Sequence, residues 1–235
     1  MPNSILRASW HKGVEGARAN VLPGLVLQAF ALSLVLSYSY VGAVQEALGQ
    51  LVEFRQRTGL LYPMVATAVF GGVLPWFYLR LQPATRNRFS IVQGVALTVF
   101  WAYKGLEVDL FYQLLAATIG EGRDVATILQ KTVLDQLVYC PVLAIPGTWF
   151  AYTWIENGFD RGVIVRRFRP SGWYAREVLP ILLSNAVVWI PAVALIYLLP
   201  TPLQLPMQNI VLCFYTLLLA HLTRPAETEG TRSTN

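Results

Sequence analysis

Residues 178–223 read VLPILLSNAVVWIPAVALIYLLPTPLQLPMQNIVLCFYTLLLAHLT, and none of these 46 residues is Asp, Glu, Lys or Arg. As a helix rising about 1.5 Å per residue, the stretch would be about 69 Å long, enough for two crossings of a ~30 Å hydrocarbon layer. Pro200, Pro202 and Pro206 divide it into apolar segments at 178–199 and 207–222, because proline cannot continue the helical hydrogen-bond ladder. The uncharged connection between them is compatible with a tight turn or with a re-entrant hairpin.

Four more apolar segments lie upstream, at 21–44, 59–79, 89–119 and 126–155. Only 13% of the 235 residues are charged and 55% are hydrophobic, whereas an average soluble domain carries about 25% charged residues. This composition excludes a soluble enzyme, a nucleic-acid-binding module and a secreted disulfide scaffold as the primary interpretation. The prediction is an all-α, polytopic transmembrane bundle of about six hydrophobic helices, with membrane lipids as its immediate partners.

The basic residues predict how the helices are oriented. With six crossings, thirteen of the eighteen Lys and Arg fall on one side, in the N-terminal segment, 80–88, 161–176 and the tail. Cytoplasmic connections of membrane proteins carry such an excess. We therefore expect both termini in the cytoplasm, or in an organellar matrix, with the protein in a bacterial inner membrane or an organellar membrane. The net charge of +5 then reflects topology and does not indicate a nucleic-acid partner.

Charged and amide side chains interrupt the third and fourth segments and are the candidate site. This polar intramembrane network consists of Lys104, Glu107, Asp109, Lys131, Asp135 and Gln136. The spacing i, i+3 lets Lys104 pair with Glu107, and the spacing i, i+4 lets Lys131 pair with Asp135. Asp109 is turned about 200° away from Glu107 on the helix and must face another helix or the interface. If both segments cross the membrane, the two charged groups lie at similar depth on adjacent helices.

Three interpretations of this network stay open at this stage. The charges are interhelical ion pairs, or they line a water-filled pathway, or one carboxylate acts as a buried acid. Unpaired charge in hydrocarbon costs at least about 2.5–3.5 kcal/mol on insertion scales, so each interpretation requires a partner or water.

The remaining sequence patterns give little indication of a catalytic or ligand-binding site. His11 and His221 stand alone, without a cluster of metal-ligand spacing, and no phosphate-binding glycine loop or nucleophile motif occurs. We therefore assign no catalytic residue, metal or cofactor. Arg166, Arg167 and Arg169 are either plain topology determinants or a binding site for anionic lipid head groups.

A family resemblance rests mainly on Lys131-x3-Asp135-Gln136-x4-Pro141. From about residue 60 to 222 the chain resembles the Mpv-seventeen/peroxisomal-membrane-protein-twenty-two family of integral membrane proteins. The further positions that carry the resemblance are Gly105, Phe111, Tyr112, Asn185, Trp189 and Pro191. The sequence departs from the family pattern at Leu106, Asp109 and Ile190.

The chain divides into three parts, of which the resemblance covers the middle one. Residues 1–58 form an N-terminal segment with an extra transmembrane helix, 59–223 form the family-like bundle, and 224–235 form a polar tail that we expect to be disordered. Members of the family lie in mitochondrial, peroxisomal and related membranes, and some are described as weakly selective pores. The resemblance carries over no catalytic residue.

The leading hypothesis from the sequence is a protein that forms or regulates a pathway for small solutes or ions, lined or gated by the polar network. The first alternative is a membrane-embedded enzyme that acts on a lipid-like or terpenoid substrate through a buried carboxylate; an apolar cavity beside one of the carboxylates would favour it. The second alternative is an assembly subunit without chemistry. A homo-oligomer is compatible with each.

Overall fold

The computed structural model describes residues 2–83, 85–87 and 89–222, and within these ranges the chain is helical and contains no strand. Its elements are α1 (Pro2–Ala19), α2 (Val21–Tyr40), α3 (Gly42–Thr58), α4 (Leu61–Thr67), η1 (Ala68–Val73), α5 (Leu74–Leu81), α6 (Ile91–Ile119), α7 (Val125–Leu134), η2 (Asp135–Ala144), α8 (Ile145–Glu156), α9 (Arg161–Phe168), η3 (Tyr174–Val178), α10 (Leu179–Ile196) and α11 (Thr201–Leu222). The predicted all-α bundle is confirmed. The predicted tail at 224–235 lies outside the described residues.

Five helical runs are long and apolar enough to cross a membrane, as expected of a multi-pass membrane protein. They are Val21–Tyr40, Leu61–Leu81, Val125–Glu156, Tyr174–Ile196 and Thr201–Leu219. The sixth predicted segment is α6, which has 29 residues and contains Lys104, Glu107 and Asp109. Many large apolar side chains on the outside are more than half exposed, among them Leu22, Val92 and Val99. Such a surface suits contact with lipid chains.

Three of the helical runs contain a π-helical stretch, and each stretch has a proline two residues beyond its end. Pro75 follows η1, Pro146 follows η2 and Pro180 follows η3, while η2 also contains Pro141. A proline ring would clash with the carbonyl one turn earlier in a regular α-helix. The wider π turn relieves this crowding, so that the helix continues through the membrane segment.

The last two segments differ from the prediction. The final helix begins at Thr201, six residues before the predicted start at 207, so the connection after α10 shortens to residues 197–200. Pro202 is tolerated because the first turn of a helix needs no backbone N–H partners, and Pro206 lies inside α11. The helices α1, α3 and α9 were not predicted from hydropathy, because their average composition is not apolar.

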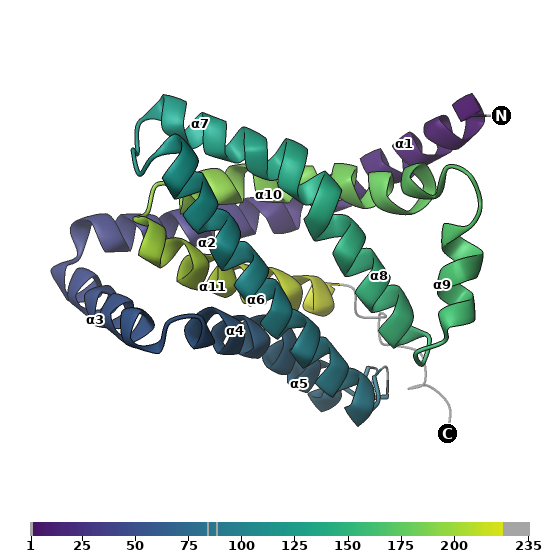
Figure 1. Cartoon of the computed structure of the whole chain (residues 1–235), viewed down its shortest axis with the longest axis horizontal. Helices are drawn as coiled ribbons and strands as arrows, with labels where there is room; N and C mark the ends of the chain where they lie inside the picture. The colour runs from purple at the N-terminus through teal and green to yellow at the C-terminus, as the bar shows by residue number, and fades with distance from the viewer. Residues whose placement is uncertain (1, 84, 88, 223–235) are drawn as a thin grey trace, which may run out of the picture.

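Two elements far apart in the sequence form the centre of the bundle. The helix α2 packs in parallel along α10, with Leu27 and Ala31 buried against a cluster that includes Val188 and Ala192. The helix α1 continues along the same partner, where Gly16 leaves room only for the side chain of Ser184. Figure 1 shows α1 and α9 at one end of the molecule. The helix α3 and the α6–α7 connection lie at the other end.

The helix α6 crosses the bundle and carries the first half of the candidate site. Its start is fixed by a capping box, in which the Ser90 hydroxyl accepts from the Gln93 backbone N–H at 3.2 Å and the Gln93 side chain accepts from the Ser90 N–H at 2.8 Å. In its middle, Gly105 allows close contact with α4, because a Cβ there would overlap the Pro63 carbonyl oxygen and lie 2.7 Å from Thr67 Cβ. This contact holds Lys104 and Glu107 on the opposite side of α6, toward η2.

Candidate functional site

An ion pair between Lys104 and Glu107 lies at the centre of the site. Lys104 is 4% exposed and its Nζ donates to Glu107 Oε1, as the i, i+3 spacing predicted. Tyr139 of η2 joins the pair across the helix interface, donating from its hydroxyl to Glu107 Oε1 at 2.8 Å and accepting from Lys104 Nζ at 3.4 Å. The Tyr139 ring stacks on Phe111 with centroids 4.3 Å apart. The pair is therefore neutralised, hydrogen-bonded and held by two helices.

The Asp135 carboxylate forms a second buried centre. It is 4% exposed, accepts from the Tyr197 hydroxyl at 2.6 Å and from Gln136 Nε2 at 2.9 Å, and also receives the Cys140 thiol at 3.5 Å. Tyr197 lies just after α10, so this carboxylate fastens η2 to the end of that helix. Donors of this kind compensate a carboxylate for lost hydration.

The predicted pairing of Lys131 with Asp135 is wrong. No ion pair joins them in the part of the chain that the structure describes, although Lys131 is 2% exposed. The oxygens of Asp135 are already occupied by Tyr197, Gln136 and Cys140. The backbone N–H of Asp135 still bonds to the Lys131 carbonyl, so the i, i+4 spacing is kept and the pairing fails because other side chains hold the carboxylate. Tyr139 connects η2 to the Lys104–Glu107 pair on α6, and among the described residues no hydrogen bond joins that pair to Lys131 or Asp135.

Asp109 faces another helix, as its turn away from Glu107 predicted. Its partner is Arg55, in the last turn of α3, and Gln113 Nε2 also donates to it at 2.7 Å. Arg55 further donates to the carbonyl of Pro202 at the start of α11. From the sequence alone, Arg55 could be interpreted only as a charge that helps to set the orientation in the membrane. Its role here follows from the placement of α3, which no local pattern reveals.

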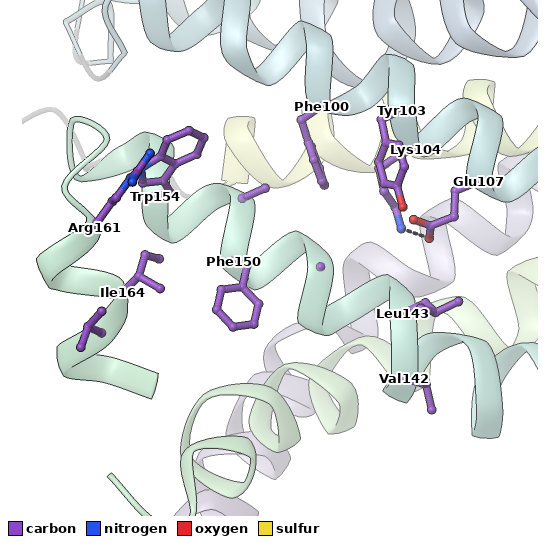
Figure 2. Close-up of a pocket in the computed structure, with 13 residues that line it drawn as sticks. Phe100, Tyr103, Lys104, Glu107, Val142, Leu143, Phe150, Trp154, Arg161 and Ile164 are labelled. Carbon is purple, nitrogen blue, oxygen red and sulfur yellow. Dashed lines mark hydrogen bonds and ion pairs between the residues drawn. The ribbon is translucent and has the colours of Figure 1, made fainter. Parts of the chain in front are cut away.

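A groove of about 810 Å³ lies between α6, the η2–α8 run and α9. Its walls are mostly apolar and aromatic, and Lys104, Glu107 and Arg161 are the charged residues among those that line it. Figure 2 shows Lys104 and Glu107 near one end of the groove and Arg161 with Trp154 at the other, with Phe100 and Phe150 between them. The other predicted network residues, Asp109, Lys131, Asp135 and Gln136, are not part of this lining.

The remaining predicted positions have structural contacts of their own. Trp189 packs edge-on against Tyr215, and the carbonyl of Pro141 accepts from the Tyr174 hydroxyl at 2.9 Å. Tyr112 is buried and donates to Gln208 at 3.3 Å. Asn185 and Pro191 lie on α10. These contacts concern packing and do not bring the family-motif positions together at the groove.

The arginines predicted to hold lipid head groups are exposed at the end of α9. Arg166 forms an ion pair with Asp160 at 3.5 Å, and Arg167 and Arg169 are also exposed. Among the described residues, no group of three or more His, Cys, Asp or Glu is placed to hold a metal ion.

Comparisons of the chain with protein-family models, with curated proteins and with solved structures found no match. The family resemblance in the sequence therefore stays a prediction, and the proposed function rests on the geometry of the site.

Proposed function

We propose that this membrane protein binds a long-chain, lipid-like molecule in the groove between α6, α8 and α9. The carrying observation is that an apolar groove ends at a partly buried carboxylate, that of Glu107, which favours a lipid-like ligand over a solute pathway. Of the candidate carboxylates only Glu107 lines the groove, whereas Asp109 and Asp135 are enclosed by their own hydrogen-bond partners.

The composition of the groove supports an apolar ligand with one polar end. Ligand sites of about 300–1,000 Å³ with apolar walls and a few placed polar groups are typical of small-molecule binding. Phe100, Val142, Leu143 and Phe150 supply the apolar wall. At the inner end the Lys104–Glu107 pair is neutral overall and presents both donors and an acceptor. A hydroxyl or carbonyl group suits such an end better than a second ion, because an extra charge there would lack a counter-charge.

Blocking the groove tests this proposal. A Cβ at Gly147 would have open space within 4 Å, and Gly147 lines the groove. The probe is brominated palmityl alcohol added to the purified protein in nanodiscs, with quenching of tryptophan fluorescence as the readout, since Trp154 lines the same groove. We expect saturable quenching that Gly147→Leu abolishes and that Trp154→Phe reduces.

The matched control is Gly49→Leu on α3, where a side chain also meets open space but far from the groove in sequence and fold. In this variant the brominated alcohol is expected to quench tryptophan fluorescence as it does in the wild type. Equal quenching in Gly147→Leu and the wild type would overturn the proposal, as would quenching that never saturates.

A pathway for small solutes or ions is the second candidate. It is favoured by four ionisable groups buried on α6 and the α7–η2 run, namely Lys104, Asp109, Lys131 and Asp135. The resemblance to a family with pore-forming members points the same way. Purified protein in planar bilayers should then conduct, and Asp135→Asn should change the conductance. A silent bilayer, or conductance unchanged by Asp135→Asn, would exclude this candidate.

A further inference from the structure

The groove has a second polar end, at Arg161, that the proposed function does not use. Arg161 is the first residue of α9 and lines the groove beside Trp154. Resting on the proposed function, we infer that the ligand is a single-chain anionic amphiphile whose head group binds Arg161 and whose chain extends toward Lys104 and Glu107. The ligand thus carries a carboxylate at one end and a neutral polar group toward the other.

Arg161 is available for an external anion. The nearest acidic residue in sequence, Asp160, accepts from the Gly162 backbone N–H at 2.7 Å and pairs with Arg166 at 3.5 Å. No ion pair engages Arg161 within the described part of the chain. Its side chain is exposed. The charged groups along the groove therefore sum to +1, from Arg161, Lys104 and Glu107, and favour an anion.

The position of Arg161 indicates where the negatively charged head group of the ligand lies. α9 lies at the end of the molecule that holds α1, where the sequence predicts the basic side of the membrane (Figure 1). A charged head group bound there remains near water, whereas one beside Lys104 would lie deep in the bundle, where charge is unfavourable. Lys104 is also already neutralised by Glu107. The head group therefore lies at Arg161 and the chain runs inward.

The length and volume of the groove suit one alkyl chain. The lining residues Val142 and Trp154 are twelve positions apart on one continuous helical run, which corresponds to about 18 Å. The volume of about 810 Å³ falls in the range of sites for single small molecules. The inferred ligand is therefore a free long-chain carboxylate rather than a two-chain phospholipid.

Competition among three probes tests the inference. Palmityl alcohol, palmitate and ω-hydroxypalmitate compete with the brominated alcohol on wild-type protein in nanodiscs at about pH 9, well above the ordinary pKa of a carboxyl group. We expect palmitate to bind about fivefold more tightly than the alcohol, the contribution of one interfacial ion pair of about 1 kcal/mol. We expect ω-hydroxypalmitate to bind more tightly still, because its hydroxyl reaches the Lys104–Glu107 pair.

Variants on α9 test the contact with Arg161 separately from binding in the rest of the groove. Arg161→Gln should remove the preference for palmitate over palmityl alcohol, whereas Arg167→Gln, on the same helix and also exposed, should leave this preference unchanged. A preference that survives Arg161→Gln would overturn the inference while leaving the proposed function intact. If palmityl alcohol itself fails to bind, the proposed function fails instead. Displacement of palmitate by phosphatidylglycerol at equal affinity would overturn the single-chain assignment.

Discussion

At the scale of single residues, Asp135 illustrates how a carboxylate is accommodated inside the bundle. The Tyr197 hydroxyl donates to it at 2.6 Å, and both side chains are buried. Hydrogen bonds inside membrane proteins average about 0.6 kcal/mol, but removing a donor from a buried charged acceptor costs more. We expect Tyr197→Phe to lower the free energy of unfolding by about 1–2 kcal/mol, measured by denaturation in mixed micelles.

The control for this measurement is Tyr215→Phe. Tyr215 is also buried, but its hydroxyl forms no hydrogen bond with the described residues, so the same atom is removed without loss of a bond. A double-mutant cycle with Asp135→Asn should show that the two changes are not additive. Additive effects would contradict a direct bond between Asp135 and Tyr197.

At the scale of elements, α7 begins at a cap that depends on pH. The side chain of Asp124 accepts from the Thr127 hydroxyl at 2.7 Å and from the Thr127 backbone N–H at 3.1 Å, and these bonds lower the pKa of its carboxyl group. A carboxylate with a lowered pKa in the folded state stabilises the helix at neutral pH, and this contribution is lost as the pH falls through that lowered value. We expect lower protection factors for the amides of Ala126 and Thr127 in acid, with each exchange rate compared with the intrinsic rate at the same pH, and in Asp124→Ala already at neutral pH.

Asp124→Ser keeps a capping oxygen but not the carboxyl group. It should protect the same amides at neutral pH and remove the acid-induced change. Equal acid sensitivity in Asp124→Ser and the wild type would show that another group is responsible.

At the scale of the whole molecule, the two ends of the bundle should face different compartments. Ser171 lies between α9 and η3, and Glu121 lies in the connection between α6 and α7. Single cysteines at these positions, in a background with Cys140→Ser and Cys213→Ala, should react with a membrane-impermeant maleimide from opposite sides. We expect Ser171→Cys to be labelled from the cytoplasmic or matrix side. Labelling of both cysteines from one side would contradict the proposed topology.

The course of the chain could largely be predicted from its hydropathy. The apolar segments became helices because a span free of charge has no other way to satisfy its backbone in lipid. The helices α1 and α3 could not be predicted from hydropathy, because their composition is not apolar and contacts with other elements hold them in place. The early start of α11 was missed because Pro202 is harmful inside a helix but harmless in its first turn.

The candidate site could be predicted only where it is local. The Lys104–Glu107 pair follows from spacing on one helix. Spacing failed for Lys131 and Asp135, because Tyr197, Gln136 and Cys140 occupy the carboxylate in place of the expected lysine. The partners Arg55–Asp109 are 54 residues apart and Asp135–Tyr197 are 62 apart, so tertiary packing alone brings them together. The groove arises from three separate helices and has no signature in the sequence.

The parallel packing of α2 on α10 has a consequence for how the protein is made. The Gln28 amide donates to the Val188 carbonyl at 2.8 Å, across 160 residues of sequence. A ribosome adding about 5–20 residues per second needs roughly 10–30 s to supply that partner. During this interval a polar amide of the first membrane segment has no partner from α10. The bond that joins α2 to α10 therefore forms only after most of the chain has been synthesised, and a nascent chain that stops before α10 leaves the Gln28 amide without this partner.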